Sequence, residues 1–229
     1  MKFLGIDTSA KAASAAVVSD GKLLGEVFVN VGKTHSQTVL PIIQDTLRFS
    51  GVSLEELDYL AVSNGPGSFT GLRIGLAAVK GLAYPQNKRC IPVSTLEALA
   101  YNLKGFKGIL CPVMDARCNQ VYTALFESDG REIRRLTGDA GISLEDLDNL
   151  LKKYSGEIFL VGDGAELCYN ELGWKLNCAL TPAHLLYQRG SGVCYAAASK
   201  TADAVECGLL VPEYLRLPQA ERELKKKTK

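Results

Sequence analysis

The sequence predicts an α/β fold that is built twice, as two lobes that each combine a mixed sheet with flanking helices. An apolar strand ends at an acidic residue in both halves, at Asp7 and again at Asp115. Each is followed by a turn, a second strand and the letters Ser-Asp-Gly, at residues 19–21 and 128–130. A strand ending "AVSNG" at Gly65 has a counterpart ending "LVGDG" at Gly164. Because the order of these landmarks repeats while the letters differ, an internal duplication explains them better than chance.

The first lobe is expected to begin with a buried strand at residues 2–7. Two further strands within residues 12–30 meet at Asp20-Gly21, which is a strong hairpin signal. A helix follows from about Thr38, because apolar residues recur on one face of residues 39–47. Pro41 then stands in the first turn, where its missing N–H has no internal partner to lose.

Capping and turn signals predict the remaining elements. Ser53 and Glu56 have capping-box spacing, and "YLAVS" at residues 59–63 follows as a short buried strand. The glycine-rich turn "SNGPGSFTG" then begins a helix, and "RCIPV" at residues 89–93 precedes a helix capped by Ser94 and Glu97. In the second half residues 109–136 repeat the opening plan, and "SLEDLD" from Ser143 repeats the helix start "SLEELD".

This plan is that of actin, the sugar kinases and acetate kinase, so we expect the duplicated actin-like/sugar-kinase-like (ASKHA) fold. Residues 1–105 would form the N-terminal lobe with the two helices that could dock a partner. Residues 106–229 would form a compact C-terminal lobe with a basic tail, "ERELKKKTK", and "LKGFKG" would join the two.

Composition excludes several classes of protein. The 229 residues are 47% hydrophobic and 22% charged with a net charge of +1, so a core forms without global attraction to nucleic acid or membrane. The seven cysteines are odd in number and show no Cys-x-x-Cys spacing, which favours buried thiols in a reducing compartment over zinc or disulfides. Asp7 interrupts the first apolar run, and no run is long enough to span a membrane. We therefore expect a cytoplasmic protein.

A nucleotide could bind between the lobes. In this architecture the first hairpin of each lobe faces the cleft, where Asp7 could hold hydrated Mg²⁺ and Thr8 and Ser9 could bind phosphate. An Asx-type turn that satisfies its own backbone is an equally good reading of "DTS". The candidate nucleotide-binding residues, for ATP or ADP with Mg²⁺, are Asp7, Thr8, Ser9, Gly65, Gly67, Asp115 and Asp163.

The glycine-rich turn lacks the letters of a P-loop or a dinucleotide fingerprint, so phosphate binding there would depend on free N–H groups at the start of the following helix. His35 has Thr38 and Val39 where a second metal ligand on the same helix face would stand. His184 lies far along the chain. We therefore assign no metal ligand and no catalytic residue from the pattern.

Two helices carry more apolar surface than one sheet needs. The helix from Phe69 has only two charged residues, Arg73 and Lys80, and is apolar nearly all round. The preceding helix has a second apolar edge at Ile42 and Phe49. Gly71, Gly75 and Ala78 would let a neighbouring helix approach closely. Ordinary packing within the chain explains some of this, and a helix-to-helix interface or a homodimer explains the rest.

Four segments together resemble the TsaB family, also called YeaZ: "FLGIDTS", "NGPGSFTGLRIGL", "MDAR" and "PEYLRLPQAER". The resemblance covers essentially the whole chain. That family is a bacterial paralogue of the TsaD/Gcp/Kae1 proteins with the same duplicated fold. The resemblance implies a non-catalytic subunit of the complex that makes threonylcarbamoyladenosine in tRNA. Such a subunit binds and activates a TsaD-like transferase, a TsaE-like ATPase joins the pair, and tRNA is contacted through the complex.

Carried onto this sequence, the interface with the transferase falls on residues 38–49 and 69–83. The residues expected there are Val39, Ile42, Ile43, Thr46, Phe49, Leu72, Arg73, Gly75, Leu76, Val79, Lys80 and Leu82. Gly75→Leu or Ile43→Asp should then abolish partner binding and leave the fold intact.

The chain departs from TsaD at the metal site. TsaD-like chains carry a His-x-x-x-His pair on the first helix, whereas here Val39 follows His35 at that spacing. A metal-dependent glycoprotease is therefore disfavoured. The alternative function is a free-standing ATPase or small-molecule kinase of the actin-like fold that uses Asp7 and Asp115.

Overall fold

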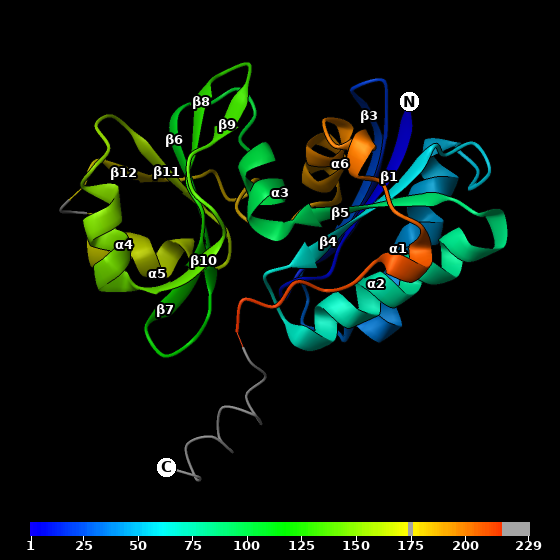
Figure 1. The fold of residues 1–229 in the computed structure, drawn as a ribbon, viewed down its shortest axis with the longest axis horizontal. Coiled ribbons are helices and arrows are strands. Elements are labelled where there is room, and N and C mark those ends of the chain that lie inside the picture. Colours follow the sequence, from blue (N-terminus) through cyan, green and yellow to red (C-terminus); the bar gives the residue numbers. More distant parts are fainter. Residues whose placement is uncertain (174–175, 217–229) are drawn as a thin grey trace, which may run out of the picture.

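The computed structural model of the chain describes residues 1–173 and 176–216, which form two lobes side by side (Figure 1). The first lobe contains a five-stranded sheet in the order β3-β2-β1-β4-β5. Its strands are β1 (Lys2–Asp7), β2 (Ala13–Ser19), β3 (Lys22–Val29), β4 (Tyr59–Gly65) and β5 (Arg89–Ser94). β2 and β3 meet at Asp20-Gly21, where both residues have positive φ, so the predicted hairpin is confirmed.

The second sheet repeats this order as β10-β7-β6-β11-β12, with β8 and β9 beside it. Its strands are β6 (Lys107–Asp115), β7 (Gln120–Thr123), β8 (Phe126–Asp129), β9 (Ile133–Arg135), β10 (Ala140–Ser143), β11 (Ile158–Val161) and β12 (Cys178–Leu180). β7 and β8 pair with β6 in one continuous register, so together they are the counterpart of β2. The turn at Asp129-Gly130 then corresponds to Asp20-Gly21. The predicted duplicated actin-like fold is confirmed.

Helices cover both faces of the first sheet. α1 (His35–Ser50) and α2 (Phe69–Ala83) lie on one face, and α3 (Thr95–Tyr101) and α6 (Gly190–Ala198) on the other. Alternate residues of β1 pack on the two faces of the sheet, because successive side chains of a strand point in opposite directions. Leu4 and Ile6 pack with α1 and α2, whereas Phe3 packs with α6.

The second sheet has α4 (Leu144–Leu151) and α5 (Ala165–Leu172) on its outer face, over a core that includes Cys111, Val113 and Leu160. Its other face packs against α3, so α3 lies between the two sheets (Figure 1). Single 3-10 turns are η1 (Tyr84–Gln86), η2 (Thr201–Asp203) and η3 (Cys207–Leu209). Within the described ranges, every helix is too short or too polar to cross a membrane.

A polar network also joins the lobes near α3. The Glu97 carboxylate accepts hydrogen bonds from Arg135 of the second lobe at 3.1 Å and from Lys200 at 2.5 Å. The Ser94 hydroxyl donates to Asp139 at 2.5 Å. Glu97 is buried, and a buried carboxylate is costly unless it is paired. Arg135 and Lys200 compensate its charge.

The chain returns to the first lobe after the second is complete. α6 packs against β1 and β2, and a β-carbon on Gly5 would lie only 2.4 Å from the Gly190 carbonyl. Beyond α6 the backbone of Val205 pairs with Cys90 at the edge of the first sheet. The expected division assigned all of residues 106–229 to the second lobe, whereas the first lobe is built from both ends of the described chain. The basic tail lies outside the described residues.

Two expected helix starts differ from the structure. α1 begins at His35, three residues before the expected Thr38, so Pro41 lies inside the helix. Its ring has no N–H to donate to the carbonyl of Gln37, and both residues are exposed. At Ser53 the side chain of Glu56 accepts from the Ser53 N–H at 2.9 Å, as in a capping box. Only a turn forms there, because β4 begins at Tyr59.

Candidate functional site

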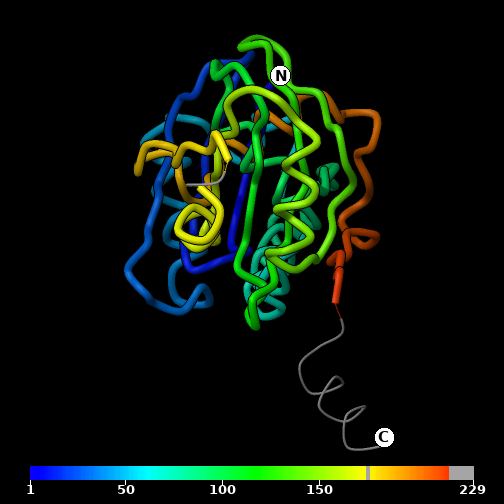
Figure 2. Tube along the Cα trace, turned by 90° about the vertical axis from the view of Figure 1, so that its left-hand side faces the viewer, coloured from blue at the N-terminus to red at the C-terminus, as the bar shows by residue number. Residues whose placement is uncertain are grey.

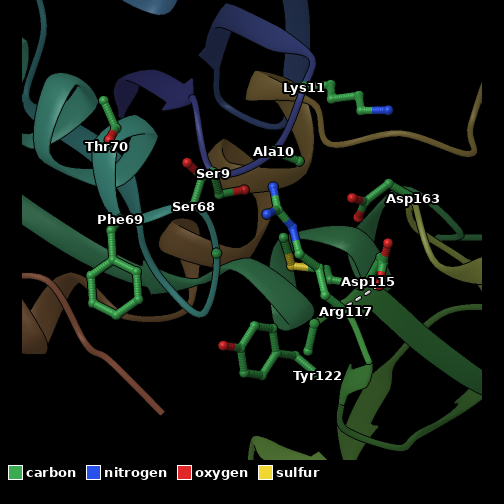
Figure 3. Close-up of a pocket in the computed structure, with 13 residues that line it drawn as sticks. Ser9, Ala10, Lys11, Ser68, Phe69, Thr70, Asp115, Arg117, Tyr122 and Asp163 are labelled. Carbon is green, nitrogen blue, oxygen red and sulfur yellow. Dashed lines mark hydrogen bonds between the residues drawn. The ribbon is translucent and has the colours of Figure 1, made fainter. Parts of the chain in front are cut away.

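A cavity of about 480 Å³ lies between the lobes, at the carboxyl ends of the parallel strands of both sheets. Its lining residues are Ser9, Ala10, Lys11, Gly67, Ser68, Phe69, Thr70, Met114, Asp115, Ala116, Arg117, Tyr122 and Asp163. In Figure 3 Asp115, Asp163 and Arg117 of the second lobe face Ser9 and Ser68 of the first lobe. Of the predicted nucleotide-binding residues, Ser9, Gly67, Asp115 and Asp163 line this cavity, and Asp7, Thr8 and Gly65 do not.

Asp7 is fully buried and its carboxylate is occupied by neighbours in the chain. One oxygen accepts from the N–H of Ser9 at 2.9 Å and from its hydroxyl at 2.7 Å, and the other accepts from the hydroxyl of Ser63. Burial raises the pKa of Asp7, although these hydrogen bonds oppose the shift. The side chain therefore makes the Asx-type turn that was one reading of "DTS", and it holds the end of β1 to the end of β4.

We expect Asp7→Asn to keep the fold and to weaken the dependence of stability on pH. A folded-state pKa above the ordinary 3.8 means that the folded state binds the proton more tightly than the unfolded state. The associated stability is present below the unfolded pKa and is lost as the pH rises through the folded pKa, about 1.4 kcal/mol for each unit of difference. Asparagine has a similar shape and does not titrate.

Urea unfolding at a series of pH values above 3.8 measures the effect. Asp163, whose pKa burial also raises, should leave a residual dependence of the same sign in the variant. The same pH profile in Asp7→Asn and in the wild type would show that Asp7 is not the titrating group.

Thr8 lies so close to α2 that two positions of the helix, Gly71 and Gly75, have no room for a side chain. The Thr8 hydroxyl donates to the Gly71 carbonyl at 2.8 Å. A β-carbon on Gly71 would lie 2.1 Å from the Thr8 carbonyl oxygen, and one on Gly75 would lie 2.3 Å from the Thr8 hydroxyl. The glycines were expected to admit a neighbouring helix. They admit instead the turn that follows β1.

The glycine-rich turn before α2 packs against the rest of the chain. A β-carbon on Gly67 would lie 2.5 Å from the Ser9 carbonyl oxygen. The N–H of Ser68 donates to that carbonyl at 2.7 Å, and the Ser68 hydroxyl caps the helix by accepting from the N–H of Gly71 at 3.3 Å. Two of the N–H groups on which phosphate binding would depend are therefore used within the chain.

The cavity itself carries charges of both signs. Asp115 ends β6 and accepts from the N–H of Arg117 at 2.7 Å, and Asp163 accepts from the buried Gln188 amide at 3.1 Å. Burial raises the pKa of Asp163, and the nearby carboxylates of Asp115 and Asp7 raise it further. A cation near Asp163 would oppose this repulsion.

The donor set fits a nucleotide only in part. Asp115 and Asp163 could hold a hydrated Mg²⁺, while Lys11, Arg117 and Ser68 could bind phosphate oxygens. Among the residues that the structure describes, no group of three or more His, Cys, Asp and Glu side chains could hold a metal ion. Lys11, Arg117 and Tyr122 were missed in the sequence. They could have been predicted, because each follows a strand-ending aspartate, Asp7 or Asp115, by a few residues.

Most of the residues expected at a partner interface lie inside this chain's own core. Val39, Ile42, Ile43, Thr46, Leu72, Gly75, Leu76 and Val79 are buried between the first sheet and the two helices. Phe49 and Arg73 are exposed, and Lys80 and Leu82 are half-buried. These eight residues are buried in the chain on its own, and the interface stays a prediction.

α1 and α2 run side by side on the outside of the first lobe (Figure 1), and three large apolar side chains on or directly after these helices are exposed. Leu40 is 49% exposed and Phe49, at the end of α1, is 71% exposed. Tyr84, directly after α2, is 80% exposed. On α2 itself the small residues Ala77 and Gly81 are exposed.

Known proteins match this chain over nearly its whole length. A family model described as TsaD, tRNA N6-adenosine threonylcarbamoyltransferase, matches residues 25–223. The tRNA threonylcarbamoyladenosine biosynthesis protein TsaB of Bacillus subtilis (strain 168) is 31% identical over 225 residues, which cover 96% of each chain. The chain belongs to the TsaB (YeaZ) family. TsaB of Escherichia coli (strain K12) is 34% identical over 190 residues, 81% of each chain.

Solved structures agree with this family assignment. YeaZ from Pseudomonas aeruginosa has a TM-score of 0.75 and 26% identity, and the match covers 93% of this chain and 99% of that one. The names of the TsaB relatives connect the family with tRNA threonylcarbamoyladenosine biosynthesis. In this TsaB-family chain the Nε2 atom of His35 lies 2.6 Å from the Ala10 carbonyl, and Val39 points into the core.

Proposed function

We propose that this chain is a cytoplasmic, non-catalytic subunit of the complex that forms threonylcarbamoyladenosine in tRNA. It binds a TsaD-like threonylcarbamoyl transferase through the outer faces of α1 and α2 and activates it. A TsaE-like ATPase joins the pair, and tRNA is contacted through the complex. In the absence of the transferase the same faces support a homodimer.

The observation that carries this proposal is the pair of helices on the outside of the first lobe. Their inner faces are used by the core, and yet Leu40 and Phe49 remain exposed on α1 and Tyr84 remains exposed after α2. Large apolar side chains that stay exposed on two neighbouring elements favour a protein–protein interface. The engagement of Asp7 by Ser9 and Ser63 supports an accessory role, because the carboxylate that ends β1 makes its hydrogen bonds within the chain.

The test is threonylcarbamoyl transfer to tRNA by the matching TsaD-like and TsaE-like proteins and the adenylate-forming enzyme, with and without this chain. We expect transfer only when the chain is present, in proportion to the amount added up to one equivalent of the transferase. Transfer that proceeds equally well without the chain would contradict the proposal.

The cleft supports a second candidate, an ATPase or small-molecule kinase. The specific observation is that Asp115, Asp163, Lys11 and Arg117 line one cavity. In the same experiment the chain alone is incubated with MgATP, and released phosphate is measured. Turnover that disappears in Asp115→Asn would favour this second candidate, whereas its absence in the chain alone together with an activated transferase would favour the first.

A further inference from the structure

Residues 205–216, which we call the strap, cross the first lobe and end at the second. The strap begins where Val205 and Cys90 exchange two backbone hydrogen bonds of 2.8 Å, and Leu210 is buried in the core beneath α2. From there it follows α2 toward the space between the lobes, as the orange and red segment shows (Figure 1). Figure 2 shows the same segment running down one side of the molecule.

The strap is bound to the first lobe at the start of α2. The N–H of Glu213 donates to the Asn64 carbonyl at 2.7 Å, and a β-carbon on Gly65 would lie 2.1 Å from the Glu213 carbonyl oxygen. The ring of Tyr214 stacks on Phe69 with centroids 4.3 Å apart. Its hydroxyl accepts from the Nε of Arg73 at 2.9 Å.

Two residues later the strap is bound to the second lobe. Arg216 donates from Nη1 to the Ala116 carbonyl at 2.8 Å, and its guanidinium carbon lies 5.8 Å from the centre of the Tyr122 ring. Ala116 and Tyr122 line the cleft from the second lobe, and Phe69 lines it from the first. Residues 213–216 therefore connect opposite walls of the same cavity.

We propose that the strap is a latch between the lobes that couples the cleft to the outer face of α2. Tyr214 and Arg216 are separated by one residue, so a movement of the Ala116 wall that breaks the Arg216 contact also disturbs the stacking of Tyr214 on Phe69. Arg73 then loses its partner and the start of α2 becomes looser. Coupling of this kind is reciprocal, so removal of Tyr214 from Phe69 also frees the Ala116 wall. The consequence for docking rests on the proposed function, whereas the latch itself does not.

Hydrogen exchange on the full chain tests the latch without any partner. In Arg216→Ala we expect amides of residues 116–122, and also those of residues 72–75 in the first turns of α2, to exchange roughly tenfold faster. That factor corresponds to the loss of one hydrogen bond from a charged group at the low end of its range. Tyr214→Ala should give the same two-sided response from the other end of the latch.

Arg134→Ala is the matched control, because Arg134 pairs only with Glu127 within the second lobe in the described structure and is exposed. It should leave both segments at wild-type exchange rates. Arg216→Lys, which keeps the charge, should restore part of the protection. If Arg216→Ala accelerates exchange only within residues 213–216, or only in residues 116–122, the strap is a passive extension and the latch is wrong.

A binding measurement with the matching TsaD-like transferase tests the second step. We expect Arg216→Ala to change the affinity severalfold. Wild-type affinity in a variant with the two-sided exchange response would overturn the coupling to docking. If even the wild-type chain fails to bind the transferase, the proposed function fails, and the exchange experiment still decides whether the latch exists.

Discussion

Ile43→Asp is expected to unfold the protein. Ile43 is 1% exposed and packs in the core between α1 and the first sheet. The variant loses the burial of an isoleucine side chain, worth about 1.5–3 kcal/mol, and places a carboxylate among the apolar side chains of the core. Together these effects exceed about 4 kcal/mol, a large part of the stability of a typical domain. Circular dichroism and urea unfolding measure the result.

Gln44→Asp is the matched control for this prediction, because Gln44 is the next residue of α1 and is exposed. It should change the free energy of unfolding by no more than about 0.5 kcal/mol. Gly75→Leu should behave like Ile43→Asp, since the Thr8 hydroxyl occupies the space of its β-carbon. The sequence had predicted that both variants would fold and lose only partner binding. A folded Ile43→Asp with native-like cooperativity would restore that interpretation.

The double variant Leu40→Asp with Phe49→Asp is expected to lose the TsaD-like transferase while remaining folded. Both side chains are exposed, so their removal costs little core burial. The Arg48 guanidinium lies 4.5 Å from the centre of the Phe49 ring, a contact worth about 0.5–1 kcal/mol at an exposed site. In an interface, by contrast, charges placed on apolar anchors cost at least about 2 kcal/mol, or roughly thirtyfold in affinity.

Titration of the transferase by calorimetry measures the affinity, and urea unfolding checks that stability has changed by less than about 1 kcal/mol. Leu167→Asp is the control, because Leu167 is an exposed apolar residue on α5 of the other lobe. It should bind as tightly as the wild type. If the double variant also binds at wild-type strength, the transferase does not use the exposed apolar side chains of α1.

The strands and their duplication were predictable because the signals are local. The apolar run of β1 and the Asp20-Gly21 turn, in which both residues have positive φ, are set by neighbouring residues, and in the counterpart turn Gly130 also has positive φ. Helix starts were less predictable, since they also depend on how the neighbouring segments pack. Ser53 and Glu56 make the contact of a capping box, and yet pairing of Tyr59 in the sheet ends the turn before a helix forms.

The sequence showed that α2 is apolar on nearly all sides. It did not show which segments cover those sides. Thr8 covers one side at Gly71 and Gly75, and the strap covers another through Tyr214 and the Gly208 carbonyl, to which Lys80 donates at 3.5 Å. These contacts join residues far apart in the sequence, so no local pattern reveals them. The surplus apolar surface therefore indicated correctly that other residues pack over α2. Most of these residues belong to the same chain.

The two strand-ending aspartates show the same limit at the site. Asp7 and Asp115 occupy equivalent positions in the duplicated pattern, and the sequence treated them alike. Asp7 is enclosed because Ser63, at the end of the neighbouring β4, donates to it. Asp115 is exposed to the cavity. Ser63, on a different strand, therefore determines that Asp115 and not Asp7 is available to a ligand.

The return of α6 to the first sheet sets an order for folding during synthesis. The Cys194 thiol contacts the carbonyls of Phe3 and Ala16, so the part of this face that β1 and β2 form stays uncovered until α6 has left the ribosome. Apolar residues of β1 and β2 therefore stay exposed to water while the whole second lobe is synthesised. Contacts of such long sequence separation slow folding and expose intermediates to aggregation. For this chain the nascent state, more than the finished one, is where chaperones would be needed.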